Sequence, residues 1–136
     1  MSTSHVVGLL FACLSAFAQD TWHDPSPHQV RFVAVEEGVQ LEVLDWGGTG
    51  RPIVLLGGYT TAHAFDDIAP KLTAAGHVYA VTRRGLGASS KPDHGYTARE
   101  SAEDVMLVLA SLKLEKPVLL GNSFGGQDLS VIGKAA

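Results

Sequence analysis

The chain of 136 residues is long enough for one small domain, and its hydrophobic fraction of 46% is ordinary for a globular protein. A formal net charge of -4 excludes the basic field that would attract nucleic acid or an anionic membrane surface. A single cysteine excludes an intrachain disulfide, and the six histidines have no cysteine pair beside them. We therefore expect no metal site and no cofactor.

The N-terminus has the pattern of a targeting signal. Residues 6–18 are almost entirely apolar, and no charged side chain precedes Asp20. Small residues at 16 and 18 suit a signal peptidase, which predicts a signal peptide over 1–18 and Gln19 as the first mature residue. The protein would then be periplasmic or secreted; without cleavage, the segment is an apolar arm of a cytoplasmic protein. The run is too short for a stable membrane span, which takes about 20 apolar residues.

A predicted β-hairpin follows an extended lead-in at 19–29, which contains two prolines. Residues 30–35 and 39–46 are rich in β-branched and aromatic side chains and flank a Glu-Glu-Gly turn, so we expect them to pair as antiparallel strands. Residues 52–56 form a continuous apolar run of strand length. Such a run is typical of a strand that is covered on both faces.

Helices and strands alternate beyond this point. Apolar residues at helical spacing predict a helix over 65–75, which Pro70 should kink or restart. A short buried strand is expected at 77–81. A loop rich in arginine, glycine and serine then extends over 82–96.

A capping box is the clearest helix signal, because Thr97 and Glu100 have the required spacing. The buried face of the helix should carry Val105, Val108, Leu109 and Leu112. The apolar run at 117–120 predicts one more strand, followed by a turn and a last helix. Strands that alternate with helices indicate an α/β fold, with the hairpin leading into a mostly parallel sheet.

The most informative motif is Gly-Asn-Ser-Phe-Gly at 121–125, directly after the last apolar run. A Gly-x-Ser-x-Gly sequence between a strand and a helix is typical of a nucleophile elbow, a sharp turn that holds a serine hydroxyl above the sheet. Gly121 and Gly125 would keep the adjacent backbone free of side-chain collisions. Ser123 is therefore the candidate nucleophile.

From residue 30 onward the chain resembles the N-terminal half of the alpha/beta-hydrolase fold family, so 30–136 would be a partial domain truncated after the elbow. Residues 53–59 resemble the family's third strand and His-Gly-x loop, with Gly57 in place of the histidine. Residues 79–89 resemble its fourth strand and the following Asp-x-Arg-Gly-x-Gly-x-Ser segment, although Thr82 stands where aspartate is common. The matching positions of that segment are Arg84, Gly85, Gly87 and Ser89.

The resemblance implies acyl transfer to water from a small ester-like substrate, with Ser123 as nucleophile. It places the oxyanion donors at the backbone N–H groups of Tyr59 and Phe124. It also implies a structural role for Arg84, whose guanidinium would bond loop carbonyls. Serine at the elbow argues against haloalkane dehalogenases and epoxide hydrolases, which resemble this family but carry aspartate there. Asn122 is similar to the residue before the serine in C–C bond hydrolases that act on ring-cleavage products, so that class stays open.

The base and the acid of a catalytic triad follow the serine in the family that the chain resembles. After Ser123 the only acid is Asp128, which we expect on the last helix facing away, and no histidine follows His94. Among the upstream histidines His63 is the best candidate base, because it follows the oxyanion loop. Surface or strand-end positions are expected for His23, His28, His77 and His94.

Two hypotheses of different class follow. In the first, the chain is the N-terminal fragment of an exported serine hydrolase and lacks the acid and the base of the triad. In the second, it is a catalytically inactive truncated product, or a binding module that keeps the cleft without turnover. In both, the elbow strand would be an open sheet edge, which could allow self-association and make the isolated chain marginally stable or insoluble.

Overall fold

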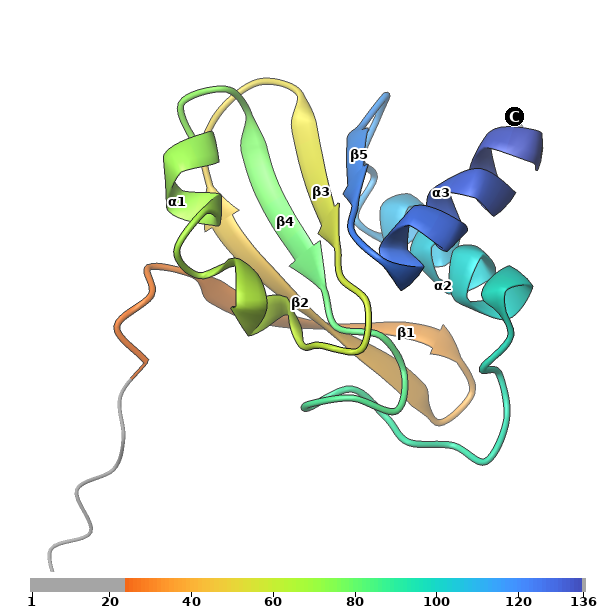
Figure 1. The fold of residues 1–136 in the computed structure, drawn as a ribbon. Coiled ribbons are helices and arrows are strands. Elements are labelled where there is room, and N and C mark those ends of the chain that lie inside the picture. The colour runs from red at the N-terminus through yellow and green to blue at the C-terminus, as the bar shows by residue number, and fades with distance from the viewer. Residues whose placement is uncertain (1–23, 136) are drawn as a thin grey trace, which may run out of the picture.

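The computed structural model describes residues 24–135, in which one mixed sheet carries helices on both faces (Figure 1). The signal peptide predicted for 1–18 and His23 lie outside the described residues. The strands of the sheet are β1 Gln29–Glu36, β2 Val39–Gly47, β3 Pro52–Leu56, β4 His77–Val81 and β5 Val118–Gly121.

The sheet has the order β1-β2-β4-β3-β5. β1 and β2 form the expected antiparallel hairpin, and β2 is also antiparallel to β4. β3 lies between β4 and β5 and is parallel to both. The α/β class predicted from the sequence is therefore confirmed, and the carboxyl ends of β3, β4 and β5 meet at one edge of the sheet.

The helical elements are the 3-10 helix η1 Ala62–Phe65, and the α-helices α1 Ala69–Leu72, α2 Ala98–Ser111 and α3 Phe124–Ala135. The bounds of the helix predicted over 65–75 are wrong, because η1 ends at Phe65 and α1 covers only Ala69–Leu72, but the expected restart at Pro70 occurs. Pro70 lies in the first turn of α1, where its missing N–H costs no hydrogen bond, so it starts a new helix. None of the helices within residues 24–135 combines the length and the apolar character needed to cross a bilayer.

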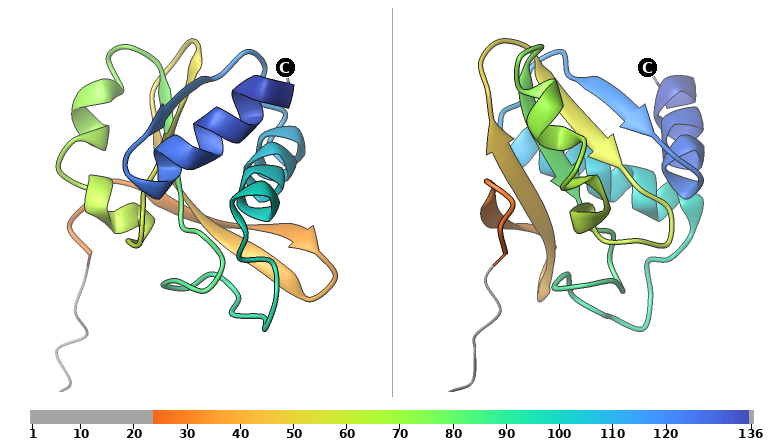
Figure 2. Two further views of the ribbon diagram at one scale, coloured as in Figure 1. Left: turned by 45° about the vertical axis from the view of Figure 1, so that its right-hand side comes forward. Right: turned by 60° about the vertical axis from the view of Figure 1, so that its left-hand side comes forward.

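Two apolar clusters cover the opposite faces of the sheet. The ribbon shows α1 on one face and α2 and α3 on the other (Figure 2). Alternate residues of each central strand point to opposite sides, so Val54 and Leu56 of β3 face α2 and α3, whereas Ile53 and Leu55 face η1 and α1. The α2 residues in the first cluster include Val105, Val108 and Leu109, with Leu112 packed against them. The helix face predicted from the sequence is thus the buried one.

β5 is an edge strand of the sheet, because its backbone pairs with β3 on one side only within the described residues. The register joins Ile53 to Val118 and Leu56 to Gly121. The side chain of Leu120 is 45% exposed, which is high for a leucine in a strand. Self-association through this edge remains a prediction.

The capping box predicted at the start of α2 is present. The Thr97 hydroxyl accepts a hydrogen bond from the N–H of Glu100 at 3.2 Å, and the Thr97 N–H donates to the Glu100 carboxylate at 3.0 Å. We expect Thr97→Ala to lower the free energy of unfolding by about 1 kcal/mol, because the N–H of Glu100 loses its hydroxyl partner. Denaturant unfolding measures the change. Ser111→Ala, at the exposed far end of the same helix, is the control and should change stability by less than about 0.5 kcal/mol.

Candidate active site

Ser123 lies at the tip of the turn between β5 and α3, and its side chain is exposed. Its φ of 56° falls in the left-handed region, which non-glycine residues rarely adopt. The turn is anchored to the neighbouring strand, because the N–H of Asn122 donates to the carbonyl of Leu56 at 3.0 Å. A strained serine that the surrounding backbone holds in place is the local geometry expected of a nucleophile elbow.

The two glycines of the motif lie where backbone segments touch. A Cβ built on Gly121 would collide with the carbonyl group of Gly125, and one built on Gly125 would collide with the carbonyl group of Leu56. These contacts join β5, α3 and β3 directly through the main chain. The sequence of the motif therefore permits a closer approach of α3 to the sheet than any side chain would allow.

The loop after β3 lies against Ser123. A Cβ built on Gly58 would lie 2.9 Å from Cβ and 3.0 Å from Oγ of Ser123. In the same place the ring of Tyr59 packs edge-on against the ring of Phe124, with centroids 4.5 Å apart. The structure thus brings together the two residues whose backbone N–H groups were predicted as oxyanion donors.

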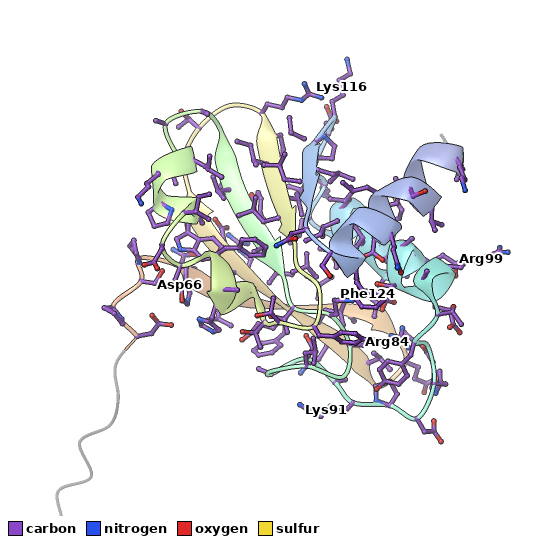
Figure 3. All side chains as sticks on the ribbon, viewed as in Figure 1. Asp66, Arg84, Lys91, Arg99, Lys116 and Phe124 are labelled. Atoms are coloured by element: carbon purple, nitrogen blue, oxygen red, sulfur yellow. The ribbon has the colours of Figure 1, made fainter. Side chains whose placement is uncertain are left out.

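A recess of about 160 Å³ opens beside this aromatic pair, between the loop after β4 and the first turns of α2 and α3. Figure 3 labels two of its lining residues, Arg84 and Phe124. Its walls combine aromatic rings, an aliphatic side chain and two guanidinium groups. The lining includes Tyr59, Tyr96, Phe124, Leu86, Arg83 and Arg84. A recess of this size has room for a small group rather than a large acyl chain.

No general base reaches the serine within residues 24–135, where the Ser123 hydroxyl has no hydrogen-bond partner. His63, the upstream candidate, lies elsewhere: its Nδ1 is 3.1 Å from the carboxylate of Asp66. His77 begins β4 and is 2.7 Å from Asp45, and His94 is exposed. The described histidines are therefore all engaged away from the serine.

His28 is not the surface residue that the sequence predicted. Its side chain is only 4% exposed, and its ring packs edge-on against the ring of Trp46 at 5.4 Å and against that of His63 at 5.2 Å. The proline-containing lead-in gave no periodicity from which burial could be deduced. The His28 side chain is buried because the lead-in lies against β2, with Trp46 Nε1 donating to the hydroxyl of Ser26.

Asp128 is on α3, as predicted, but it faces inward rather than away. Its side chain is 1% exposed and forms an ion pair with Arg83, which follows β4. Burial raises the pKa of the Asp128 carboxyl above its ordinary value, although Arg83 acts in the opposite direction. One carboxylate oxygen is buried without a hydrogen-bond partner. Asp128 thus joins α3 to the loop after β4 and has no contact with Ser123.

Arg84 has the structural role implied by the resemblance, but its main partner is a carboxylate. Its Nε and Nη2 donate to the two oxygens of Asp104 at 2.8 and 2.7 Å, a bidentate pair that joins the loop after β4 to α2. One expected loop carbonyl, that of His94, also accepts from Arg84 at 3.3 Å. The Asp104 partner was not predicted, because pairing across 20 residues leaves no spacing signal.

Thr82 stands where the resemblance would place an aspartate; it is buried and supports the loop after β3. Its hydroxyl donates to the Glu42 carboxylate at 2.6 Å and accepts from the N–H of Ala62 at 2.8 Å. Glu42 was missed by the sequence analysis. A charged residue within the apolar β2 was the available signal.

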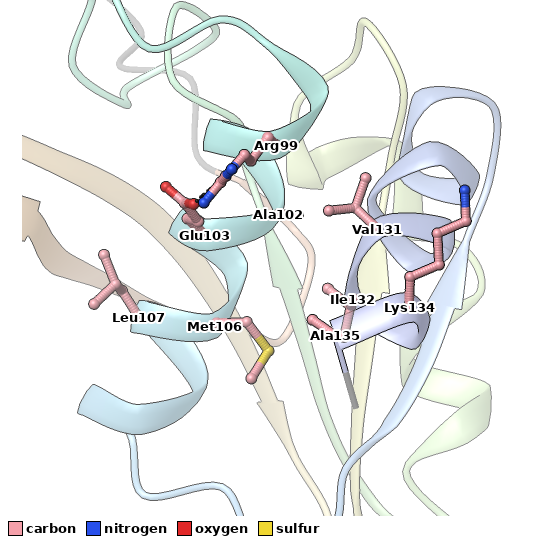
Figure 4. Close-up of a pocket in the computed structure, with 9 residues that line it drawn as sticks. All are labelled: Arg99, Ala102, Glu103, Met106, Leu107, Val131, Ile132, Lys134 and Ala135. Atoms are coloured by element: carbon pink, nitrogen blue, oxygen red, sulfur yellow. Dashed lines mark hydrogen bonds and ion pairs between the residues drawn. The ribbon is translucent and has the colours of Figure 1, made fainter.

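A second, apolar groove of about 680 Å³ lies between α2 and the far end of α3 (Figure 4). Its charged lining includes Arg99 and Glu103, which pair with each other at 2.9 Å. The other lining residues are mostly aliphatic: Ala102, Met106, Leu107, Val131, Ile132 and Ala135. The groove's lining has no serine, threonine or cysteine, so the candidate active site is the elbow.

Comparison with known proteins agrees with this geometry. A sequence profile described as "Alpha/beta hydrolase family" matches residues 53–135. The chain is similar to AB hydrolase superfamily protein YisY of Bacillus subtilis (strain 168), with 38% identity over 97 residues, covering 70% of this chain and 36% of the relative. It is also similar to epoxide hydrolase A of Mycobacterium tuberculosis, with 34% identity over 98 residues, covering 65% and 29%.

A solved structure described as "Est816 as an N-Acyl homoserine lactone degrading enzyme" has a similar fold. The TM-score is 0.71 at 32% sequence identity, and the match covers 76% of this chain and 40% of that one. The chain spans about a third of the length of the curated relatives that it matches.

Proposed function

Because the chain belongs to the alpha/beta hydrolase family, we propose that Ser123 is the nucleophile of a hydrolase that acts on ester-type bonds of a small molecule. The observation that carries the proposal is the left-handed backbone of Ser123 at the strand-to-helix tip, with the backbone of Gly58 packed against its side chain. A strained serine in contact with a glycine loop does not stabilise the fold. The same conformation does present the serine hydroxyl for attack on a carbonyl carbon.

The proposed reaction has two steps. The Ser123 oxygen bonds to the carbonyl carbon, the alkoxide leaves, and the hydroxyl proton passes through a base to that alkoxide. Water then attacks the acyl carbon, the bond to the Ser123 oxygen breaks, the base passes a proton from the water to that oxygen, and the carboxylic acid is released. In both steps negative charge develops on the carbonyl oxygen, where the N–H groups of Tyr59 and Phe124 would donate hydrogen bonds. Since residues 24–135 give Ser123 no base, we place the histidine and its acid outside the described residues.

An ester-type substrate fits the residues better than an epoxide does. Ring opening by covalent catalysis at this position uses the carboxylate that the resemblance assigns to epoxide hydrolases, and Ser123 has none. The similar solved structure is described as degrading a lactone, and a lactone is a cyclic ester. The small recess beside Phe124 would hold a compact part of such a substrate.

A fluorophosphonate probe tests the assignment of the nucleophile. We expect the folded chain to be labelled slowly at Ser123, with a rate that rises about tenfold per pH unit above neutrality, because without a histidine the serine must lose its proton to solvent. Labelling should disappear in Ser123→Ala and persist in Ser130→Ala, whose exposed serine lies on the same helix. Mass spectrometry of the labelled peptide measures both.

Two results would contradict the proposal. Labelling that survives in Ser123→Ala would assign the reactivity to another residue. A folded chain that stays unlabelled even at alkaline pH would favour the non-catalytic binding module. A nucleophilic serine with oxyanion donors should still react in the absence of its base, only more slowly.

A further inference from the structure

Four titratable side chains meet where the lead-in to β1 crosses η1, on the part of the molecule that Figure 3 labels with Asp66. Asp24 and His28 come from the lead-in, whereas His63 belongs to η1 and Asp66 follows it. Each residue offers one ligand atom, and these atoms all lie within 4.8 Å of one another. The set of two imidazoles and two carboxylates is assembled by the fold from two distant segments.

The spacing within this His-Asp cluster suits a small cation. His63 Nδ1 lies 3.2 Å from Oδ2 of Asp24 and 3.1 Å from Oδ2 of Asp66. His28 approaches Asp24 through Nε2 at 3.6 Å and Asp66 Oδ1 through Nδ1 at 3.3 Å. Four ligands at about 2.0–2.1 Å from a tetrahedral zinc ion stand about 3.3–3.4 Å apart. The contacts of His63 Nδ1 and the contact of His28 Nδ1 with Asp66, at 3.1 to 3.3 Å, have about the length of such an edge.

Two atoms of the cluster are buried without a hydrogen-bond partner among the described residues, and they face each other. They are Nδ1 of His28 and Oδ1 of Asp66, 3.3 Å apart. The His28 side chain is 96% buried, given its exposure of 4%. A buried polar atom left without a partner costs free energy, and a cation between imidazole and carboxylate would satisfy both atoms at once.

The surroundings hold these side chains in the orientation that a metal needs. The Asp24 carboxylate accepts from the N–H of Ser26 at 2.9 Å through the oxygen that does not face the histidines. The Nε2 of His63 points to the buried carboxylate of Glu42 at 3.8 Å, while its Nδ1 faces the cluster. An imidazole that turns one nitrogen to a metal and the other to a carboxylate is the usual arrangement in zinc proteins.

We propose that Asp24, His28, His63 and Asp66 bind a divalent transition-metal ion of the zinc class. Two imidazole and two carboxylate ligands suit Zn²⁺ and its analogue Co²⁺ better than Ca²⁺ or Mg²⁺, which prefer oxygen alone. The ion would tie the lead-in to η1, beside the loop that follows β3. The sequence analysis expected no metal because it considered spacing along the chain and cysteine pairs, and this cluster uses neither.

Titration of the metal-free, untagged chain tests the proposal. We expect Co²⁺ to bind in a one-to-one ratio with the visible absorption bands of a tetrahedral site, and Zn²⁺ to displace it. His63→Gln should weaken Zn²⁺ binding by more than about a hundredfold, since even residues that only support a zinc ligand contribute ten- to a hundredfold. Zn²⁺ should also raise the thermal midpoint of the chain and leave that of His63→Gln unchanged.

Two controls make the outcome decisive. His94→Gln removes an exposed histidine that pairs with Glu36, and it should keep the affinity for Zn²⁺. If His63→Gln does not give the circular dichroism spectrum of the folded chain, Asp66→Asn tests the same site, because it changes a half-buried carboxylate of the cluster. The proposal is overturned if the folded chain binds no Co²⁺, or if Asp66→Asn and His63→Gln bind as tightly as His94→Gln. The four residues would then be an ion-pair cluster without a metal.

Discussion

Replacing Gly125 by alanine is expected to destabilise the folded chain by about 3 kcal/mol and to abolish labelling of Ser123. A Cβ at Gly125 would collide with the carbonyl group of Leu56, which is backbone and has no rotamer with which to yield. The same carbonyl accepts the hydrogen bond from Asn122 that anchors the elbow, so moving it also releases the turn. Denaturant unfolding and the rate of fluorophosphonate labelling measure the two effects.

Gly126 provides the matched control, since it is the next residue of α3 and a Cβ built on it meets no atom within 4 Å. Gly126→Ala should therefore be neutral, or stabilise the helix by up to about 1 kcal/mol through the better helix propensity of alanine. If Gly125→Ala and Gly126→Ala had equal stability and equal labelling, the close contact between α3 and β3 would not matter to the elbow.

The elements that were predicted correctly depend on interactions between residues close in sequence. The strand at 77–81 was predicted as a short buried strand and is β4 over the same residues. The start of α2 was predicted from Thr97 and Glu100, which bond to each other across three residues. The placement of Ser123 at a strand-to-helix tip likewise follows from glycines two residues to either side. Such signals are contained in the local sequence, so they need no knowledge of the tertiary structure.

The features that could not be predicted depend on contacts between distant segments. The inward orientation of Asp128 is set by Arg83, which is 45 residues earlier, and α3 alone gives no reason to prefer that face. The burial of His28 is set by Trp46 and His63. Pro70 was recognised as a break, but whether it kinks a helix or begins a new one depends on how η1 and α1 pack on the sheet.

Replacing Arg83 by methionine is expected to lower the free energy of unfolding at neutral pH by about 3 kcal/mol, because it leaves the Asp128 carboxylate buried without its cation. The Asp128 side chain is 1% exposed and has one oxygen already unpartnered, so water is in no position to replace the guanidinium. Denaturant unfolding of the two proteins measures the loss. A change below about 1 kcal/mol would mean that the pair is solvated as surface pairs are.

Two further variants separate the charge from the packing. Arg83→Met combined with Asp128→Leu should recover most of the lost stability, because an apolar pair of similar volume replaces the buried ion pair. Arg99→Met is the matched control, since it breaks an arginine-carboxylate pair with Glu103 that is largely exposed. It should cost less than about 1 kcal/mol.

The loss in Arg83→Met should also depend on pH, with a sign that the burial of Asp128 determines. Burial raises the pKa of this carboxyl above its ordinary value of 3.8, so the folded chain binds its proton more tightly than the unfolded chain does. The stability that this group contributes is therefore fully present below pH 3.8 and is lost as the pH rises through the raised pKa.

Without Arg83 the pKa of the Asp128 carboxyl rises further, so the loss of stability at neutral pH is larger. The difference in unfolding free energy between the original chain and Arg83→Met should consequently shrink as the pH is lowered toward about 4. The other carboxylates titrate alike in both proteins, so their contributions cancel in this difference. A difference that stays constant over this range would show that Arg83 stabilises the fold through its packing and not through its charge.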